Sequence, residues 1–433
     1  MSETILPRAE SARGAKAGRL TKLGRQLVEG QLRKLAHGEV TLIDGDHVTR
    51  CGAAGALAAA VEVRDPEFYS DVAFGGSLGA AESYIQGRWT ADDLTALLRI
   101  FARNLDVSDE MERGWARLAA PTARWFHKVR SNTKAGSRKN IRAHYDLGND
   151  LFQLFLDPTM NYSAGIFETP ETTLEEASIA KMDRLCRKLE LNADDHLLEI
   201  GTGWGAMAMH AAREYGCRVT TTTISKEQHK LAGARIAAAG LDDRITVLLS
   251  DYRDLTGTYS KIVSVEMIEA VGHDFLESYF GQCGRLLAPN GMLAVQGITM
   301  AEHRYDRYRR EVDFIQRYIF PGSCLPSVAA MCQAAGNASD LRPAHLEDMT
   351  PHYAETLRRW RANFFANIEQ VRNLGYSEEF VRLWDYYLCY CEAGFEEGTC
   401  GSVQLTWAKP GRRRDTIDLA APGKKSEGAR CGI

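Results

Sequence analysis

The residues with the clearest chemical capacity are three glycines spaced two apart, Gly201, Gly203 and Gly205, which follow an acidic residue, Glu199. The glycines join an apolar run to a segment rich in alanine and methionine, so the pattern predicts a buried strand that turns sharply into a helix. Glycine allows a tight turn and lets a ligand approach the backbone with no Cβ in the way. We therefore expect a ligand site at this turn.

The spacing of these glycines distinguishes two kinds of nucleotide-like ligand. A dinucleotide site uses G-x-G-x-x-G and places an acid at the end of its second strand, where it binds the ribose hydroxyls. Here the spacing is G-x-G-x-G, and the predicted second strand runs into Thr220–Ser225, with Glu227 as the first acid. Both features count against a dehydrogenase. They match the first motif of methyltransferases that use S-adenosylmethionine.

A further polar side chain, Asp251, follows the predicted third strand, 245–249. Its carboxylate is placed to accept a hydrogen bond from an adenine amino group. It is equally placed to cap the segment 252–255 that follows it. Both interpretations stay open on the sequence alone.

The elements that position these residues alternate between strand and helix, with short connections. The expected strands are 197–200, 218–223, 245–249, 261–265 and 292–298. The expected helices are 175–189, 206–215, 225–239 and 275–287. This alternation favours an α/β fold with a doubly wound, mostly parallel sheet, whose ligands bind at the carboxyl ends of the strands. Residues 403–408 are expected to close the sheet as its last strand.

The length of 433 residues favours two or three domains. We expect a basic amphipathic helical lead at 1–36, an N-terminal α/β domain at 37–120, a basic linker at 121–140, a methyltransferase domain at 141–409 and a flexible tail at 410–433. The N-terminal domain is expected to hold short strands at 39–43, 47–51, 61–63 and 72–74 and a helix at 92–104. Residues 303–400 are expected to be mainly helical, and we interpret most of their many aromatic side chains as core packing.

Two segments combine cations with apolar or aromatic side chains. Residues 1–36 carry a leucine stripe and a basic side, which indicates a helix that either packs on the domain below it or contacts an anionic membrane surface. Residues 121–140 interleave basic and aromatic residues, which fits an ordinary solvated linker or an interfacial membrane contact. A nucleic-acid contact is the weaker hypothesis, because the tract is short and belongs to no recognised binding module.

The overall composition argues against several classes of protein. The net charge of −4 gives no sign of a polyanionic partner. There is no apolar run of about 18 residues and no apolar leader, so neither a membrane span nor secretion is expected. The 10 cysteines include no C-x-x-C pair, which indicates reduced cytoplasmic thiols and no metal site.

Several stretches between residues 140 and 408 follow one another in an order that is itself informative. They are His144–Phe152, Leu156–Ser163, Glu199–Gly205, Ile224–Gln228, Glu266–His273, Tyr318–Ser327 and Tyr390–Phe395. Together they resemble the cyclopropane-fatty-acyl-phospholipid synthases, in the family that also holds the mycolic acid methyltransferases. The stretch Gly76–Tyr84 resembles the substrate-side domain of that family. The chain is identified as a member of this family.

The resemblance implies S-adenosylmethionine as the cofactor. The positions that match its binding residues in the family are Tyr162, Ser163, Gly201, Gly203, Thr223 and Gln228. We add three polar residues near the glycine turn and the strand ends, Glu199, Ser225 and Asp251, to this expected cofactor-binding set.

The resemblance also implies a reaction in which an alkene attacks the sulfonium methyl group and leaves a carbocation on an acyl chain. A base then removes a proton from the new methyl group, and a ring closes. In the family this base is a bicarbonate ion held by a Cys, a Glu, a His, a Tyr and backbone groups. The Glu maps to Glu269 and the Tyr to Tyr353, whereas Ala164 stands at the Cys position and Gln296 at the His position.

These two departures alter the expected bicarbonate pocket. Gln296 still donates to an oxyanion, but the side chain of Ala164 donates nothing. Glu269 is expected to act as a base itself, to order an anion or water, or to cap a nearby helix or loop. Cys391 matches a late cysteine of the family, with buried packing as its alternative role. The expected catalytic set is therefore Glu269, Tyr353, Gln296 and Cys391.

The leading hypothesis is an enzyme that methylates the double bond of unsaturated acyl chains in membrane phospholipids and forms a cyclopropane. Its close rival is the same transfer with proton loss elsewhere, which gives a methyl- or methylene-branched or furan-precursor chain. A small-molecule or nucleic-acid methyltransferase and a silent lipid-binding protein are the other classes. We expect a cytoplasmic protein, peripheral at the inner face of the membrane, with transient membrane contact and no nucleic-acid partner. A homodimer is left open.

Overall fold

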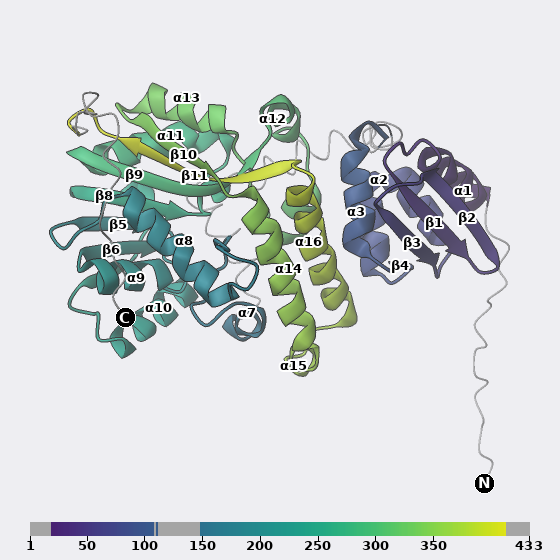
Figure 1. Cartoon of the computed structure of the whole chain (residues 1–433), viewed down its shortest axis with the longest axis horizontal. Helices are drawn as coiled ribbons and strands as arrows, with labels where there is room; N and C mark the ends of the chain where they lie inside the picture. Colours follow the sequence, from purple (N-terminus) through teal and green to yellow (C-terminus); the bar gives the residue numbers. More distant parts are fainter. Residues whose placement is uncertain (1–18, 108–109, 111–147, 413–433) are drawn as a thin grey trace, which may run out of the picture.

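The computed structural model describes residues 19–107, 110 and 148–412 (Figure 1). The predicted linker at 121–140, the first eighteen residues and most of the predicted tail at 410–433 lie outside the described residues. Within the described part of the chain, no helix has both the length and the apolar character needed to cross a membrane.

A seven-stranded mixed sheet forms the larger half of the molecule, in the order β10-β11-β9-β8-β5-β6-β7. Its strands are β5 (His196–Ile200), β6 (Arg218–Thr223), β7 (Ile245–Leu249), β8 (Tyr259–Val265), β9 (Leu287–Met300), β10 (Arg342–Asp348) and β11 (Cys400–Ala408). The pairs among β5 to β9 are parallel, and β11 pairs antiparallel with both β9 and β10. The expected α/β fold with a doubly wound, mostly parallel sheet is confirmed.

Helices cover both faces of this sheet because its central strands alternate side chains between two apolar cores. Leu197 of β5 packs with helices α8 (Leu174–Lys188), α9 (Ala206–Tyr215) and α10 (Lys226–Ala238). Its neighbour Leu198 faces the other side and packs with α11 (Leu276–Leu286) and α13 (Val328–Ala338). Because these strands are buried on both faces, their sequences show no regular alternation of apolar and polar residues.

The strand at the edge of the sheet differs from the prediction. Residues 403–408 were expected to close the sheet, but β11 lies between β9 and β10. β10 falls inside the segment expected to be helical, and most of its side chains are exposed. An exposed edge strand carries little apolar periodicity, so its sequence gives a weak strand signal.

A second sheet, ordered β2-β1-β3-β4, forms the smaller N-terminal unit. Its elements are α1 (Arg19–Leu32), β1 (Gly38–Asp44), β2 (His47–Ala53), β3 (Ala58–Val63), α2 (Glu67–Ile85), β4 (Trp89–Ala91) and α3 (Leu94–Arg103). The strand expected at 72–74 is wrong, since these residues lie in α2. Phe68, Tyr69 and Val72 are buried there at helical spacing, and Gly76 breaks the helix with φ of 59°.

The N-terminal unit packs on a helical layer that carries the aromatic-rich segment (Figure 1). This layer consists of α7 (Asn149–Phe155), α12 (Glu302–Tyr308), the π-helical turn Ile315–Ile319, α14 (Thr350–Ala366), α15 (Ile368–Asn373) and α16 (Glu378–Glu396). Tyr84 of α2 donates to Asp385 of α16 over 2.7 Å, and Arg99 of α3 pairs with Glu397 just after α16 over 2.7 Å. One apolar core runs through both layers, so the two units share their interior.

Candidate active site

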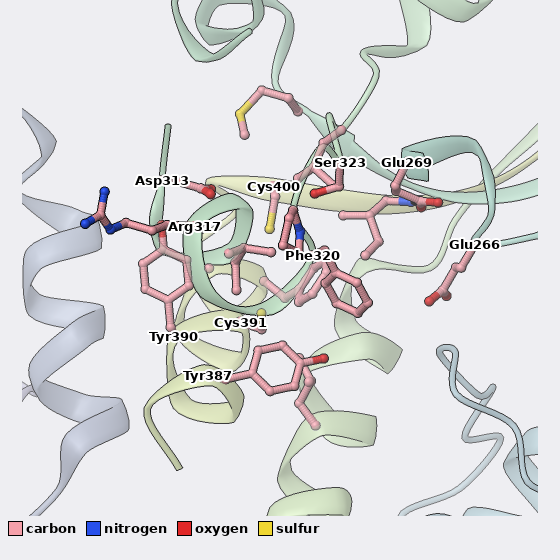
Figure 2. A pocket seen from close by; sticks show the side chains of 18 of the residues that line it. Glu266, Glu269, Asp313, Arg317, Phe320, Ser323, Tyr387, Tyr390, Cys391 and Cys400 are labelled. Carbon is pink, nitrogen blue, oxygen red and sulfur yellow. Dashed lines mark hydrogen bonds between the residues drawn. The ribbon is translucent and has the colours of Figure 1, made fainter. Parts of the chain in front are cut away.

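A cavity of about 1960 Å³ lies between the carboxyl ends of the parallel strands and the helical layer. It takes in the glycine turn, the segment after β8, and the aromatic walls of α14 and α16. Figure 2 shows Glu266 and Glu269 toward one end of this cavity and Asp313 and Arg317 toward the other. Ordinary small-molecule pockets measure about 300–1,000 Å³, so this cavity suits a bulky, mostly apolar ligand together with a second molecule.

The glycine turn adopts backbone angles that other residues rarely reach. Gly201 has φ of 105° and Gly203 φ of 50°, and both line the cavity. A Cβ on Gly201 would approach the side chain of Met267 to 3.3 Å, whereas a Cβ on Gly203 would meet no protein atom within 4 Å. The turn therefore leaves open space beside Gly203, where a ligand reaches the backbone.

Glu199 lies directly before this turn and lines the same cavity. It is fully buried, and its Oε2 atom has no hydrogen-bond partner. Burial raises the pKa of Glu199 to about 8. A buried carboxyl oxygen without a partner is costly, and a ligand hydroxyl or ammonium group at this place would satisfy it.

The polar residues at the next strand ends have different roles. Thr223 donates to Gln228 over 2.8 Å, and both side chains line the cavity. Ser225 instead caps α10 by accepting from the backbone N–H of Gln228, and it does not line the cavity. Asp251 lines the cavity and also receives two hydrogen bonds from the Arg253 side chain and one from its backbone N–H. Its capping role is thus present alongside its place in the cavity wall.

Tyr162 and Ser163 approach the cavity from the loop after α7. The Tyr162 hydroxyl lies 2.8 Å from the hydroxyl of Tyr387 on α16. Ser163 accepts a hydrogen bond of 2.7 Å from Lys181, which also donates to Asn161 over 3.1 Å. Lys181 is fully buried, and burial lowers its pKa to about 8. It stands on α8 as a cation close to several buried carboxyl groups.

Two further carboxyl groups of the site, Glu266 and Glu269, belong to the segment that follows β8, and Glu266 is one of those that interact with Lys181. Glu266 accepts hydrogen bonds from the Ala164 backbone N–H over 2.9 Å, from Gln296 over 2.9 Å and from the Tyr353 hydroxyl over 2.5 Å. Glu269 accepts one, from the Ile298 backbone N–H, and its Oε2 atom has no partner. Three donors therefore converge on one carboxylate while its neighbour is left largely unsatisfied.

The pKa values of the two groups follow from these surroundings. Burial, followed by the charge of Glu266, raises the pKa of Glu269 to about 8. Burial also raises the pKa of Glu266, but the hydrogen bonds from Tyr353 and Gln296 oppose that rise. Because two adjacent buried carboxyl groups do not both ionise readily, the three hydrogen bonds to Glu266 favour it over Glu269 as the ionised member of the pair.

Gln296 does not reach the cavity surface; it is fully buried behind Glu266. Its Oε1 atom accepts from Gln404, whose own Oε1 atom accepts from Lys188 over 2.7 Å. Lysine only donates, so it fixes the direction of both amides and leaves the Nε2 atom of Gln296 facing Glu266. We call Lys188, Gln404 and Gln296 the amide chain.

Substitution of Lys188 by methionine is expected to remove the donor that orients this amide chain. The Oε1 atom of Gln404 would lose its donor, and turnover is expected to fall several-fold with a loss of about 1–2 kcal/mol in unfolding free energy. Kinetic assays and urea unfolding measure the two effects. Lys188→Arg, which keeps a donor-only group, is the matched control, and equal effects of both substitutions would contradict the orienting role.

Cys391 lies in the wall of the cavity beside Cys400 (Figure 2). Burial raises the pKa of the Cys391 thiol well above its usual range, so the group is a neutral thiol at neutral pH. The structure thus places all four expected catalytic residues at or directly behind the cavity wall, with Glu269, Tyr353 and Cys391 lining it.

The cofactor end of the cavity fits S-adenosylmethionine. Open space lies beside Gly203, and Glu199 offers an unpartnered buried carboxyl oxygen. Gln228 and Asp251 add polar groups to the same wall. These residues would hold the cofactor, which would supply an electrophilic methyl group to the same cavity.

Sequence reasoning missed two residues of this site, Glu266 and Lys181. Glu266 directly follows the apolar strand β8, and this position next to a strand end is a signal for a site residue. Lys181 lies on the apolar face of α8, one turn from the buried Ala177 and Leu185. A lysine at such a position is a signal for a buried, partnered cation.

Comparison with known proteins places the whole chain among lipid-modifying enzymes. The family model described as mycolic acid cyclopropane synthetase matches residues 132–405. A tuberculostearic acid methyltransferase, UfaA1, of Mycobacterium tuberculosis is 40% identical over 387 residues, which cover 88% of this chain and 90% of the relative. The cyclopropane-fatty-acyl-phospholipid synthase of Escherichia coli K12 is 36% identical over 363 residues, which cover 82% of this chain and 89% of the relative.

The solved structures similar to this chain point the same way. Mycolic acid cyclopropane synthase CmaA1, complexed with SAH and CTAB, aligns with a TM-score of 0.59 and 33% identity. The alignment covers 63% of this chain and 98% of that one. The cyclopropane synthase MmaA2 from Mycobacterium tuberculosis aligns with a TM-score of 0.58 and 30% identity, over 63% of this chain and 98% of that one.

Proposed function

The chain belongs to the mycolic acid cyclopropane synthetase family of S-adenosylmethionine-dependent methyltransferases that act on lipids, and we propose a finer substrate and product. The substrate is an unsaturated acyl chain of a membrane phospholipid, and the product is a cyclopropane across its double bond. The observation that carries this proposal is the single cavity that joins the glycine turn, the carboxyl pair and an aromatic wall.

The cavity supplies what an attack by an alkene requires. S-adenosylmethionine supplies an electrophilic methyl group when it is bound. The π electrons of the alkene form a carbon–carbon bond to that methyl group as its bond to sulfur breaks, which leaves a cation on the acyl chain. Tyr353, Tyr387 and Phe320 line the cavity with aromatic faces, and such faces stabilise cations. Loss of a proton from the new methyl group then closes the ring.

A methyl- or methylene-branched chain is the second candidate product. A methyl-branched alkene would form if the proton left a neighbouring carbon of the chain, and a methylene branch would form if a hydride first moved from the methyl-bearing carbon to the cation and the methyl group then lost its proton. The name of the 40% identical relative, a tuberculostearic acid methyltransferase, favours keeping this alternative. Ala164 favours it as well, because its side chain donates nothing; only its backbone N–H reaches Glu266, and its carbonyl oxygen accepts from Gln296.

Incubation with methyl-labelled S-adenosylmethionine and vesicles of an unsaturated phosphatidylglycerol tests the proposal. Label is expected in the lipid fraction, with a gain of one CH₂ in mass spectra, and vesicles of a fully saturated lipid serve as the control. Ozone cleaves a methylene-branched chain but not a cyclopropane, so it separates the two products. The proposal falls if no label reaches the lipid.

Arginine side chains in the cavity wall, among them Arg317 at the end away from the carboxyl pair (Figure 2), support a phospholipid substrate. They are Arg304, Arg307, Arg309, Arg310 and Arg317, and we call them the arginine rim. Arg307 and Arg309 pair with nearby acids, whereas Arg304 and Arg310 carry no ion pair within the described residues. Cations at the mouth of an apolar cavity suit a lipid phosphate.

Replacement of both Arg304 and Arg310 by alanine is expected to raise KM for anionic vesicles about thirtyfold at low ionic strength, with kcat nearly unchanged. Each cation near an anionic surface contributes about 1 kcal/mol, and salt screens this contribution. Initial rates at low and high ionic strength measure the effect. Arg213 and Arg218, which are exposed beside the amino ends of the strands, give a matched double alanine control. A rim variant that behaves like this control would argue against a headgroup contact.

We also propose that the enzyme is peripheral, at the inner face of the membrane, and binds it transiently. The arginine rim supports this placement, as do the exposed Leu23 and Leu27 on α1. The N-terminal unit would then be the substrate-side domain, because several of its apolar residues also line the cavity.

A further inference from the structure

We infer that Glu266 is the base of the reaction, a carboxylate built into the chain at the place where a free anion would otherwise be needed. This inference rests on the proposed alkene methylation. It goes beyond it by assigning the proton acceptor to a residue of the protein.

The contacts of Glu266 are those of a bound oxyanion. Its Oε1 atom accepts from the Ala164 backbone N–H and from Gln296, each over 2.9 Å, and its Oε2 atom accepts from the Tyr353 hydroxyl. These donors come from three distant segments of the chain. They are also three of the positions at which the sequence suggested a bicarbonate site. In this protein their hydrogen bonds already go to Glu266.

The charge distribution supports Glu266, and not Glu269, as the proton acceptor. Glu269 has a single donor, and burial together with the charge of Glu266 keeps it neutral near pH 7. Glu266 has three donors, and the buried cation Lys181 adds a favourable charge interaction. Glu266 also lines the cavity, so its carboxyl group is available to the reacting chain.

The backbone of Glu266 gives an independent indication. Its φ is 48°, in the left-handed region that a residue with a side chain seldom adopts. The position thus combines backbone strain with a half-buried carboxylate at the cavity wall, and both reduce stability. Glycine would avoid both, so stability alone does not explain a glutamate here. Strain of this kind is concentrated at functional sites.

The step assigned to Glu266 balances without a further reactant. After methyl transfer, the acyl chain carries one positive charge and the sulfur leaves as a neutral thioether. The Glu266 carboxylate takes one proton from the new methyl group. The electron pair of that C–H bond forms the closing C–C bond of the ring, the charge on the chain is neutralised, and Glu266 becomes a carboxylic acid.

Two substitutions separate loss of the carboxylate from loss of its space. Glu266→Gln keeps the shape and removes the charge, whereas Glu266→Gly also opens a cavity lined by the same three donors. Glycine suits the φ of 48°, so this variant is expected to fold. Both variants are assayed with unsaturated phosphatidylglycerol vesicles, in CO₂-free buffer and with added bicarbonate. Calorimetric titration checks that each still binds S-adenosylmethionine.

The wild type is expected to form product in CO₂-free buffer at its full rate. Both variants are expected to lose about a hundredfold in rate without bicarbonate. Bicarbonate is expected to raise the rate of Glu266→Gly at least about tenfold and to leave the rate of Glu266→Gln unchanged. Only the glycine variant has room for the ion.

The possible failures are distinguishable. If the wild type transfers no label to lipid, the proposed function falls and the assignment of Glu266 falls with it. If the wild type is active but needs bicarbonate, or if Glu266→Gln keeps its rate, only the assignment of Glu266 is overturned. A folded Glu266→Gly variant that binds the cofactor and gains nothing from bicarbonate overturns the placement of the base.

Discussion

Glu269→Gln is expected to stabilise the protein near pH 7.5. In the folded protein the pKa of Glu269 is raised to about 8, from an ordinary value of 4.5. The folded state therefore holds a proton that the unfolded chain releases between these pH values. Stability is lost as pH rises through this range, by about 1.4 kcal/mol per pH unit for each such group.

The variant removes this loss at one position. Its advantage in unfolding free energy is expected to be near zero at about pH 4.5 and to reach about 4 kcal/mol near pH 7.5. Glu199 keeps a similar pH dependence in both proteins, since its pKa is also raised to about 8. Urea unfolding at the two pH values measures the difference, and Glu227→Gln, at an exposed carboxyl group, is the control. A pH-independent difference would contradict a raised pKa at Glu269.

Gly203→Leu is expected to abolish binding of S-adenosylmethionine while the protein stays folded. The new side chain would start from a point with no protein atom within 4 Å, in the space that the cofactor needs. We expect a loss of at least about a hundredfold in affinity, which corresponds to about 3 kcal/mol. The φ of 50° adds a backbone cost of about 1–2 kcal/mol to folding.

Gly240→Leu provides the matched control for this backbone cost. Gly240 has φ of 65°, a Cβ there would also meet no atom within 4 Å, and the residue is exposed after α10. Both variants should lose similar stability in thermal unfolding, but only Gly203→Leu should lose cofactor binding in calorimetric titration. Normal binding by Gly203→Leu would place the cofactor elsewhere.

The parallel core of the sheet was predictable because its signals are local. Three elements have the predicted bounds: α9 at 206–215, β6 at 218–223 and β7 at 245–249. Local signals such as a neighbouring glycine or a capping side chain mark where these elements begin and end. The short apolar run at 72–74 was ambiguous, because three residues do not distinguish a strand from one turn of a helix. Its helical assignment depends on burial against the rest of the N-terminal unit.

The site was predictable where a residue's role follows from its backbone, and less so where it follows from packing. Gly201 and Gly203 can be recognised from the sequence as site residues, because the turn requires backbone angles that glycine adopts readily. Glu266 and Glu269 are two acids three residues apart, and nothing local says which one meets three donors. That outcome depends on Gln296 and Tyr353, which belong to β9 and α14.

The amide chain has a consequence for how this protein evolves. Replacement of Gln296 alone removes the acceptor of the Gln404 amide N–H group. Replacement of Gln404 alone removes the group that both Lys188 and Gln296 bind. Each single step leaves a buried polar group unsatisfied, at a cost of about 1–3 kcal/mol. The three positions should therefore change together across related sequences, as one inherited set. A surface-proximal lysine on α8 would then covary with a glutamine beside the reacting carboxylate, although no contact joins them directly.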